Sequence, residues 1–315
     1  MSNICISCKK NNLEFLDDYK YEIKKDIKFL GKMKIYECQD CKLAFSYPMP
    51  KISKLEEFYR KVYRSQNRHH YYSYFDKKFS YLFDINLEYI SYLTANIDFN
   101  NIKYILDFGA GLGNIGYALK KKFKHLELFC IESDENCLNT LKERGYKNIK
   151  NIEEANCKFD LVISLHVLEH LTNLEFFNEI TKFIKKDGYF FFEVPNSDFN
   201  LGYKKRIFDS PHLIFFNIKN INTIFQKNGM FQISLLNASY TIDHDIENQL
   251  KSFIVFNKNS IALKIKKLLK KFMPLFFIVI IRKYLIYSNA LSDDKLKWYF
   301  NNLSTGRCLR GIYKK

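Results

Sequence analysis

The feature that most constrains this chain is an apolar strand signal that runs into a glycine-rich turn between Ile105 and Gly116. From Asp107 the turn reads Asp-Phe-Gly-Ala-Gly-Leu-Gly, and a helix signal follows it. Glycines at Gly109, Gly111 and Gly113 let the backbone approach a bound molecule closely and allow positive φ angles. The first amides of the next helix have no partner within that helix and face the same space. This arrangement predicts an α/β unit that holds a nucleotide-like ligand.

Two classes of ligand use such a turn. The segment from Gly111 to Gly116 also fits the dinucleotide pattern, with an acid, Glu132, about 20 residues further on. In that pattern the strand runs straight into the first glycine, whereas here Asp107 and Gly109 come before it. The order Asp-x-Gly-x-Gly-x-Gly resembles the first motif of class I S-adenosylmethionine-dependent methyltransferases. We therefore expect S-adenosylmethionine as the cofactor, with a dinucleotide and an unliganded turn as alternatives.

The next strand signals follow in the order that this resemblance requires. Residues 127–132 predict a second strand that ends in Glu132, whose carboxylate can accept hydrogen bonds from both hydroxyls of a ribose. The alternative is a solvent-exposed acid, and Asp134 is the neighbour that could be mistaken for the ligand. Residues 159–164 form an apolar run with β-branched residues, which is typical of a buried parallel strand.

Three later segments, 165–170, 188–196 and 210–216, resemble class I methyltransferases that modify small molecules, sugars and quinone precursors. The resemblance covers roughly residues 100–240. In that family the loop after the fourth strand passes beside the cofactor. The cofactor-binding residues that the resemblance implies are Asp107, Gly109, Gly111, Gly113, Glu132, Ser164, Leu165 and His166.

Methyl transfer requires alignment of the acceptor with the methyl group and a group that removes the acceptor proton. A hydroxyl acceptor favours a base that titrates near neutrality, and histidine is the natural choice. Of the 7 histidines, His212 is our first candidate, because the resemblance places an acceptor-facing histidine followed by aromatics in its segment. His166 is the second candidate, and His170 is expected to cap or pack the following helix. For any single histidine, a surface or packed imidazole is the alternative.

The amino-terminal segment carries two Cys-x-x-Cys pairs, Cys5 with Cys8 and Cys38 with Cys41. Four thiolates at this spacing predict a closed tetrahedral site for a structural Zn²⁺, with a hairpin between the pairs. Redox thiols and disulfides are the alternatives. We disfavour them because no secretory signal precedes Cys5 and the other cysteines are scattered in core-like contexts, as expected in a reducing, cytoplasmic compartment. A catalytic zinc would need an open position that four sulfurs do not leave.

Residues 41–50 resemble the zinc knuckle, and the chain segment that leaves it, which precede the methyltransferase domain in several sugar-modifying enzymes. The tyrosine-rich residues 55–75 then resemble a helical cap over the cofactor, although an ordinary helical core would have the same composition. The net charge of +16 raises a nucleic-acid partner as an alternative. The lysines are spread along the chain, however, and residues 164–167 lack the Asn-Pro-Pro-Tyr-like segment of base-methylating enzymes. We therefore disfavour a nucleic-acid partner and keep RNA methylation only as an alternative.

One basic segment is patterned as an amphipathic helix. Between Ile261 and Phe272 the apolar residues fall on one helical face and the lysines on the other. The apolar run from Leu275 to Ile281 is shorter than the ~20 residues that a membrane-spanning helix needs. We therefore expect residues 261–283 to have one of three roles: a lid over the substrate cleft, a contact in a homodimer, or a helix that lies on the inner membrane surface as a peripheral contact.

These signals predict an α/β fold with a class I methyltransferase, Rossmann-like sheet. The sheet is mostly parallel, and the last strand, near residues 308–313, inserts antiparallel beside the sixth, near 229–236. The expected domains are a zinc-binding ribbon (1–50), a helical cap (51–100), the S-adenosylmethionine-binding domain (101–244), a helical insertion or lid (245–302) and the last strand (303–315).

The expected activity is O-methylation of a small-molecule or glycan acceptor, a sugar carried on a nucleotide or in a surface polysaccharide. C-methylation of a nucleotide-linked keto-sugar is the nearest alternative, because enzymes of that type share the zinc knuckles and the histidine segment. They carry a large additional carboxy-terminal domain, for which this chain has no room. A non-catalytic, cofactor-binding zinc scaffold is the remaining alternative, and it would bind the cofactor without turnover.

Overall fold

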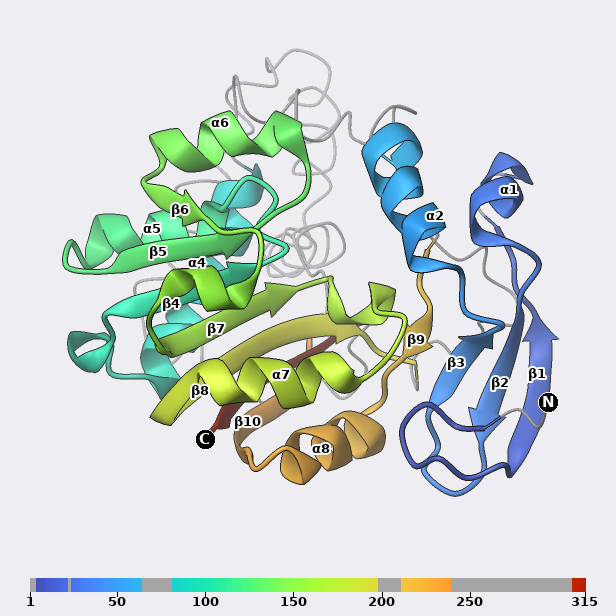
Figure 1. The fold of residues 1–315 in the computed structure, drawn as a ribbon. Helices are drawn as coiled ribbons and strands as arrows, with labels where there is room; N and C mark the ends of the chain where they lie inside the picture. The colour runs from blue at the N-terminus through green and yellow to red at the C-terminus, as the bar shows by residue number, and fades with distance from the viewer. Residues whose placement is uncertain (1–3, 22–23, 64–80, 198–210, 239–307) are drawn as a thin grey trace, which may run out of the picture.

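The computed structural model describes residues 4–21, 24–63, 81–197, 211–238 and 308–315. These residues form two sheets, a large one in the middle of the chain and a small one at the amino terminus (Figure 1). The predicted insertion at 245–302, including the amphipathic segment 261–283, lies outside the described residues. Within the described ranges, no helix is long and apolar enough to cross a membrane.

The large sheet has seven strands, and their order and directions confirm the predicted fold. In sheet order the strands are β10 (Phe231–Ala238), β11 (Cys308–Lys314), β8 (Ile184–Pro195), β7 (Phe159–Leu165), β4 (Tyr104–Phe108), β5 (Glu127–Ile131) and β6 (Tyr146–Asn148). The strands from β8 to β6 run parallel to their neighbours, whereas β11 is antiparallel to both β8 and β10. The last strand is therefore inserted between the fifth and sixth strands of the fold, as the sequence predicts.

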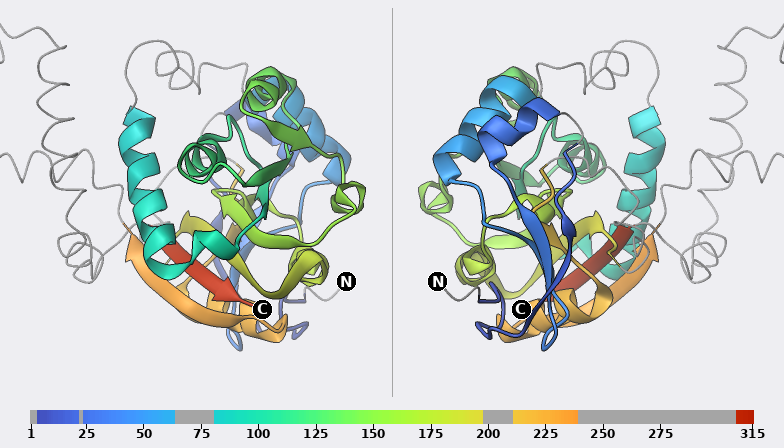
Figure 2. Two further views of the ribbon diagram at one scale, coloured as in Figure 1. Left: turned by 90° about the vertical axis from the view of Figure 1, so that its left-hand side faces the viewer. Right: turned by 90° about the vertical axis from the view of Figure 1, so that its right-hand side faces the viewer.

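Helices cover both faces of this sheet, because each parallel crossover must return over one face. The main helices are α4 (Tyr81–Asn96), α5 (Asn114–Lys122), α6 (Glu135–Glu143), α7 (Glu175–Phe183) and α8 (Ile218–Lys227). Buried side chains of α7 and α8 belong to one hydrophobic cluster and those of α4, α5 and α6 to the other, on the opposite face (Figures 1 and 2). Short helical turns are η1 (Lys24–Asp26), η2 (Tyr59–Tyr63), η3 (Phe99–Asn101), η4 (Ile152–Ala155) and η5 (Leu168–His170).

The small sheet contains the predicted hairpin and one strand that the sequence did not predict. Its order is β1 (Leu13–Asp18), β2 (Lys34–Cys38), β3 (Ala44–Tyr47) and β9 (Ile214–Phe215), all antiparallel. The helices α1 (Ile27–Leu30) and α2 (Ile52–Phe58) accompany it. The first three strands come from the amino terminus, whereas β9 comes from the chain between β8 and α8. The small sheet therefore combines three amino-terminal strands with one strand from the chain that follows β8 of the large sheet.

The strand β8 shows how the sequence builds the two faces of the core. Phe190 and Phe192 face one hydrophobic cluster and Phe191 the other, because successive side chains of a strand point to opposite faces. On the first face, Phe225 of α8 stacks on Tyr313 with ring centroids 4.2 Å apart. The ring of Phe225 is also surrounded by Phe177, Phe190 and Phe192 at centroid distances of 5.2, 5.1 and 5.1 Å.

Truncating this ring should destabilise the protein strongly. We predict that Phe225→Ala lowers the free energy of unfolding by about 3–5 kcal/mol, because it removes a fully buried ring and leaves a cavity. Equilibrium unfolding in urea measures the change. The matched control is Phe231→Ala, since the Phe231 side chain is 71% exposed and its loss should change stability by less than about 0.5 kcal/mol. Equal effects of the two substitutions would contradict this packing.

Candidate functional site

The turn after β4 has the backbone conformation that its glycines permit. Gly109 and Gly113 have φ angles of 70° and 67°, in the left-handed region that side chains disfavour. A Cβ atom on Gly109 would lie 2.4 Å from Val167, and one on Gly113 would lie 2.6 Å from Leu141 and Tyr146. Gly113 is also the N-cap of α5. Both positions therefore require glycine for conformation and for space.

Glu132 follows β5 and faces the same turn. Its Oε2 accepts a hydrogen bond of 2.7 Å from the Gly111 amide, and its Oε1 accepts one of 2.8 Å from the Asp134 amide. Each carboxylate oxygen has further acceptor capacity. Asp134 has a different role, because its side chain caps α6 by accepting from the Asn136 amide. The structure thus brings the turn and Glu132 together at the carboxyl ends of two adjacent parallel strands.

Asp107 lies beneath this turn and is buried. The hydroxyl of Tyr146 lies 3.2 Å from Asp107 Oδ2 and 2.9 Å from the Gly113 carbonyl, so it connects the strand to the turn. Burial raises the pKa of Asp107 to about 7, and the charge of Glu132 adds to this effect, while the Tyr146 hydrogen bond opposes it. The sequence analysis did not identify Tyr146, because a tyrosine at a short strand carries no motif.

The loop after β7 contains the other predicted cofactor residues. Ser164 is fully buried, and within the described part of the chain its hydroxyl has no hydrogen-bond partner. Leu165 is half-buried at the end of β7. His166 has a φ angle of 55°, and its backbone amide donates a 2.8 Å hydrogen bond to the Glu193 carbonyl. A buried hydroxyl without a partner is costly, so Ser164 fits a site that receives a polar ligand atom.

The imidazole of His166 lies between two buried carboxylates. Its Nε2 is 3.2 Å from Glu193 Oε1 and its Nδ1 is 3.5 Å from Glu169 Oε1. Burial by itself lowers the pKa of His166, but the two carboxylates outweigh burial and raise it to about 10. Because a protonated imidazole cannot accept a further proton at neutral pH, this arrangement disfavours His166 as a base.

Glu193 is the centre of a buried polar network that the sequence analysis missed. Tyr89 donates to its Oε1 and Arg310 to its Oε2, both at 2.6 Å. The side chains of Glu193 and Arg310 are only 2% and 3% exposed. Burial raises the pKa of Glu193, but Arg310 and His166 outweigh it and hold the value at about 2. The available signal was a glutamate that directly follows three phenylalanines in β8 and an arginine inside the buried strand β11.

The first candidate for the base, His212, lies beside His170 and Glu169. The rings of His170 and His212 are 5.0 Å apart between centroids and inclined by 60°. His170 Nε2 is 3.9 Å from Glu169 Oε1, and one nitrogen or oxygen of each of the three side chains lies within 4.8 Å of the others. His170 Nδ1 lies 3.0 Å from the Pro211 carbonyl, so this residue contacts the His212 segment.

The backbone of Leu213 ties the segment that carries His212 to the loop after β7 and to β3. Its amide donates to the Glu169 carbonyl at 2.7 Å, and its carbonyl accepts from the Ser46 amide of β3 at 2.8 Å. His212 therefore sits between the loop after β7 and the amino-terminal sheet, immediately before β9. The structure brings His166, His170 and His212 into one cluster around Glu169.

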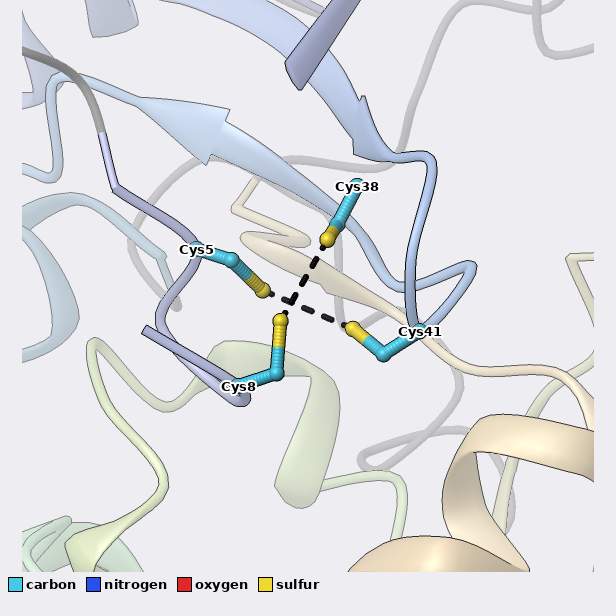
Figure 3. Close-up of side chains that lie close together, drawn as sticks. All are labelled: Cys5, Cys8, Cys38 and Cys41. Atoms are coloured by element: carbon cyan, nitrogen blue, oxygen red, sulfur yellow. Dashed lines mark hydrogen bonds between the residues drawn. The ribbon is translucent and has the colours of Figure 1, made fainter. Parts of the chain in front are cut away.

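The four amino-terminal cysteines form a second site (Figure 3). The sulfur atoms of Cys5 and Cys41 are 3.5 Å apart, and those of Cys8 and Cys38 are also 3.5 Å apart. In a tetrahedral site with four metal–sulfur bonds the sulfurs would be roughly 3.8 Å apart. The hydrogen bond between Cys5 and Cys41 lowers the pKa of Cys5 to about 5 and raises the pKa of Cys41. The geometry and donor set therefore fit one metal ion.

Comparisons with known proteins agree with this fold. A family model described as a methyltransferase domain matches residues 68–240, more than half of the chain. The uncharacterized protein MJ0638 of Methanocaldococcus jannaschii is 31% identical over 118 residues, which are 36% of this chain and 51% of that protein. The chain thus spans about half the length of this curated relative.

Two solved structures are among those found to be similar to this chain. The plantazolicin methyltransferase BpumL in complex with SAH is 13% identical, with a TM-score of 0.47 over 83% of this chain and 93% of its own. Coclaurine N-methyltransferase bound to N-methylheliamine and SAH is 14% identical, with a TM-score of 0.44 over 74% of this chain and 72% of its own.

The charge on His166 gives a test that depends on pH. Its pKa of about 10 in the folded protein lies above the value of about 6.5 for an unfolded histidine, so folding favours proton binding. The stabilisation is complete below pH ~6.5 and is lost as pH rises toward 10. We predict that the difference in unfolding free energy between the wild type and His166→Gln shrinks over this range. Urea unfolding at several pH values measures it, and a constant or growing difference would contradict the assigned charge.

Proposed function

This chain belongs to the methyltransferase-domain family, and on that premise we propose that it transfers a methyl group from S-adenosylmethionine to a small polar acceptor. The observation that carries the proposal is the glycine turn after β4 with the carboxylate of Glu132 beside it. An open backbone turn and a strand-end acid on the adjacent parallel strand are what a nucleoside needs for recognition.

Each part of the cofactor has a group in this chain that suits it. Glu132 would accept hydrogen bonds from the ribose hydroxyls, and the turn from Gly109 to Gly113 would let the nucleoside approach the backbone. The buried hydroxyl of Ser164 would meet a polar atom of the bound molecule. When bound, S-adenosylmethionine supplies a methyl group that is already activated by its sulfonium. The chain then has to orient the acceptor, exclude water and remove a proton.

For the acceptor we propose a sugar hydroxyl, with His212 as the general base. His212 is half-buried, and it is preceded by Pro211 and followed by the apolar β9, so its backbone is well held. His166 is engaged by two carboxylates, which leaves His212 as the better candidate of the two. The sugar acceptor rests on the resemblance of the histidine segment to sugar-modifying methyltransferases.

We further propose that the four cysteines hold a structural Zn²⁺. Thiolates at tetrahedral spacing are the preferred ligands of structural zinc, and four of them leave no position for a substrate. The ion would fix the two Cys-x-x-Cys turns relative to each other. Each turn has a lysine with positive φ directly after its second cysteine, Lys9 after Cys8 and Lys42 after Cys41, so the two turns are alike.

Binding of the cofactor can be tested without knowledge of the acceptor. We predict that Glu132→Ala weakens binding of S-adenosylhomocysteine by about 100-fold, or roughly 2.7 kcal/mol, because the ribose loses its acceptor. Isothermal titration calorimetry measures the affinity. The matched control is Glu135→Ala, an exposed acid at the start of α6, which should leave the affinity unchanged. Equal affinities in the two variants, or tight binding of NADH to the wild type, would contradict the assignment.

The acceptor and the base can be tested together. A radiolabelled methyl-transfer screen over nucleotide sugars, glycan fragments and RNA should find turnover on a sugar. On that acceptor, His212→Ala should lower kcat by about 10²–10⁴-fold, the usual contribution of a general base. Its affinity for S-adenosylhomocysteine should stay unchanged, which serves as the control for folding. Near-normal turnover by His212→Ala would exclude it as the base, and turnover on RNA alone would exclude the sugar.

A further inference from the structure

Glu169 is a buried carboxylate that the proposed mechanism does not yet use. Its side chain is 2% exposed, and within the described residues neither of its carboxylate oxygens has a hydrogen-bond partner. A buried carboxylate in this state is costly unless nearby positive charge stabilises it. Three imidazoles, those of His166, His170 and His212, lie around it.

The charges of the surrounding network can be counted from its contacts. Glu193 pairs with Arg310 at 2.6 Å, so these two buried charges balance. Glu169 then needs one positive charge, and His166 provides it when both of its ring nitrogens carry protons and face the two carboxylates. With that proton on His166, His212 does not have to be charged for the network to be neutral. His212 is then able to accept a proton.

His170 lies beside both Glu169 and His212. Its Nδ1 lies 3.0 Å from the Pro211 carbonyl, which can only accept, so Nδ1 carries the hydrogen. The other nitrogen, Nε2, is 3.9 Å from Glu169 Oε1, and the ring contacts the His212 ring. From η2, Tyr59 packs against the His170 ring at 6.1 Å. The orientation of His170 is therefore fixed by the segment that carries His212.

We propose that Glu169 is a positioning residue for deprotonation of the acceptor, and that its negative charge stabilises the imidazolium that forms on His212. This inference rests on the proposed function. The proton moves from the acceptor hydroxyl to a ring nitrogen of His212. The electron pair of the acceptor oxygen forms the new bond to the methyl carbon, and the electron pair of the broken carbon–sulfur bond stays on sulfur. Glu169 stays ionised throughout, and His170 packs beside both side chains.

The test measures proton binding by individual histidines and needs neither cofactor nor acceptor. The full-length protein and Glu169→Gln are labelled with ¹⁵N-histidine and titrated by NMR, with resonances assigned from single His→Gln variants. Removal of the negative charge should lower the titration midpoint of His212 by about one pH unit. His125, whose Nε2 contacts the Phe99 and Ile102 carbonyls away from this cluster, is the internal reference and should titrate identically in both proteins.

Glu175→Gln is the matched control, because Glu175 is an exposed acid at the start of α7, close in sequence to Glu169. It should leave the His212 titration unchanged. An unchanged midpoint for His212 in a folded Glu169→Gln protein would overturn the proposal. So would a His212 imidazole that does not titrate in the wild type, as would be expected of a metal-bound ring.

A second readout becomes available once an acceptor is identified. Below the pKa of His212 the base is protonated and inactive, so this pKa sets the acidic limb of the kcat profile. In Glu169→Gln the limb should move to lower pH and the plateau of kcat should fall, with the affinity for S-adenosylhomocysteine unchanged. If no methyl transfer is found at all, the proposed function fails, whereas the NMR titration still decides whether Glu169 controls His212.

Discussion

The pairing of β9 with β3 is the interaction on which the candidate site depends. Ala44 pairs with Phe215 and Phe45 with Ile214, so a strand from the second half of the chain completes the amino-terminal sheet. The side-chain amides of Asn217 and Asn220 both donate to the Lys42 carbonyl, at 3.3 and 3.1 Å. Lys42 directly follows Cys41, so the second cysteine turn is fastened to the start of α8. The cysteine module is therefore joined to the start of α8 by hydrogen bonds and to the segment after His212 by strand pairing.

The hydrophobic core supports the same conclusion. Leu43 and Ala44 of the amino-terminal region belong to the same buried cluster as Phe190 and Phe225 of the large sheet and its helices. A continuous core of this kind resists relative movement, because packed side chains leave few alternative arrangements. His212 follows Pro211 and precedes β9, so its position is set jointly by the small sheet and by the loop after β7.

Structural elements that are marked by a pattern of a few neighbouring residues could be predicted from the sequence. The glycine turn, the strand ending near Glu132 and the two cysteine pairs were predicted from patterns of a few residues, because short-range sterics and ligand chemistry demand them. The inserted last strand was predicted from the resemblance. In contrast, β9 contains only Ile214 and Phe215, and its partner lies far away in the sequence, so no local pattern could indicate its pairing.

The buried polar network could not be predicted for a similar reason. Glu193 follows three phenylalanines in β8, and only the antiparallel insertion of β11 beside β8 places Arg310 opposite it. The charge on His166 depends on another long-range contact, because the pairing of β7 with β8 places Leu165 opposite Glu193 and brings this carboxylate beside His166. The sequence already ranked His212 before His166, but the two carboxylates around His166 could not be predicted from it.

We propose that the cysteine module holds His212 in place, while the turn and Glu132 bind the cofactor. Removal of the metal with a chelator under reducing conditions tests this, with the ¹⁵N resonances of His212 and the affinity for S-adenosylhomocysteine followed together. We expect one zinc ion per chain before treatment, a changed and broadened His212 resonance after its removal, and an affinity that stays nearly constant. A protein without zinc, or an unchanged His212 resonance after metal loss, would contradict it.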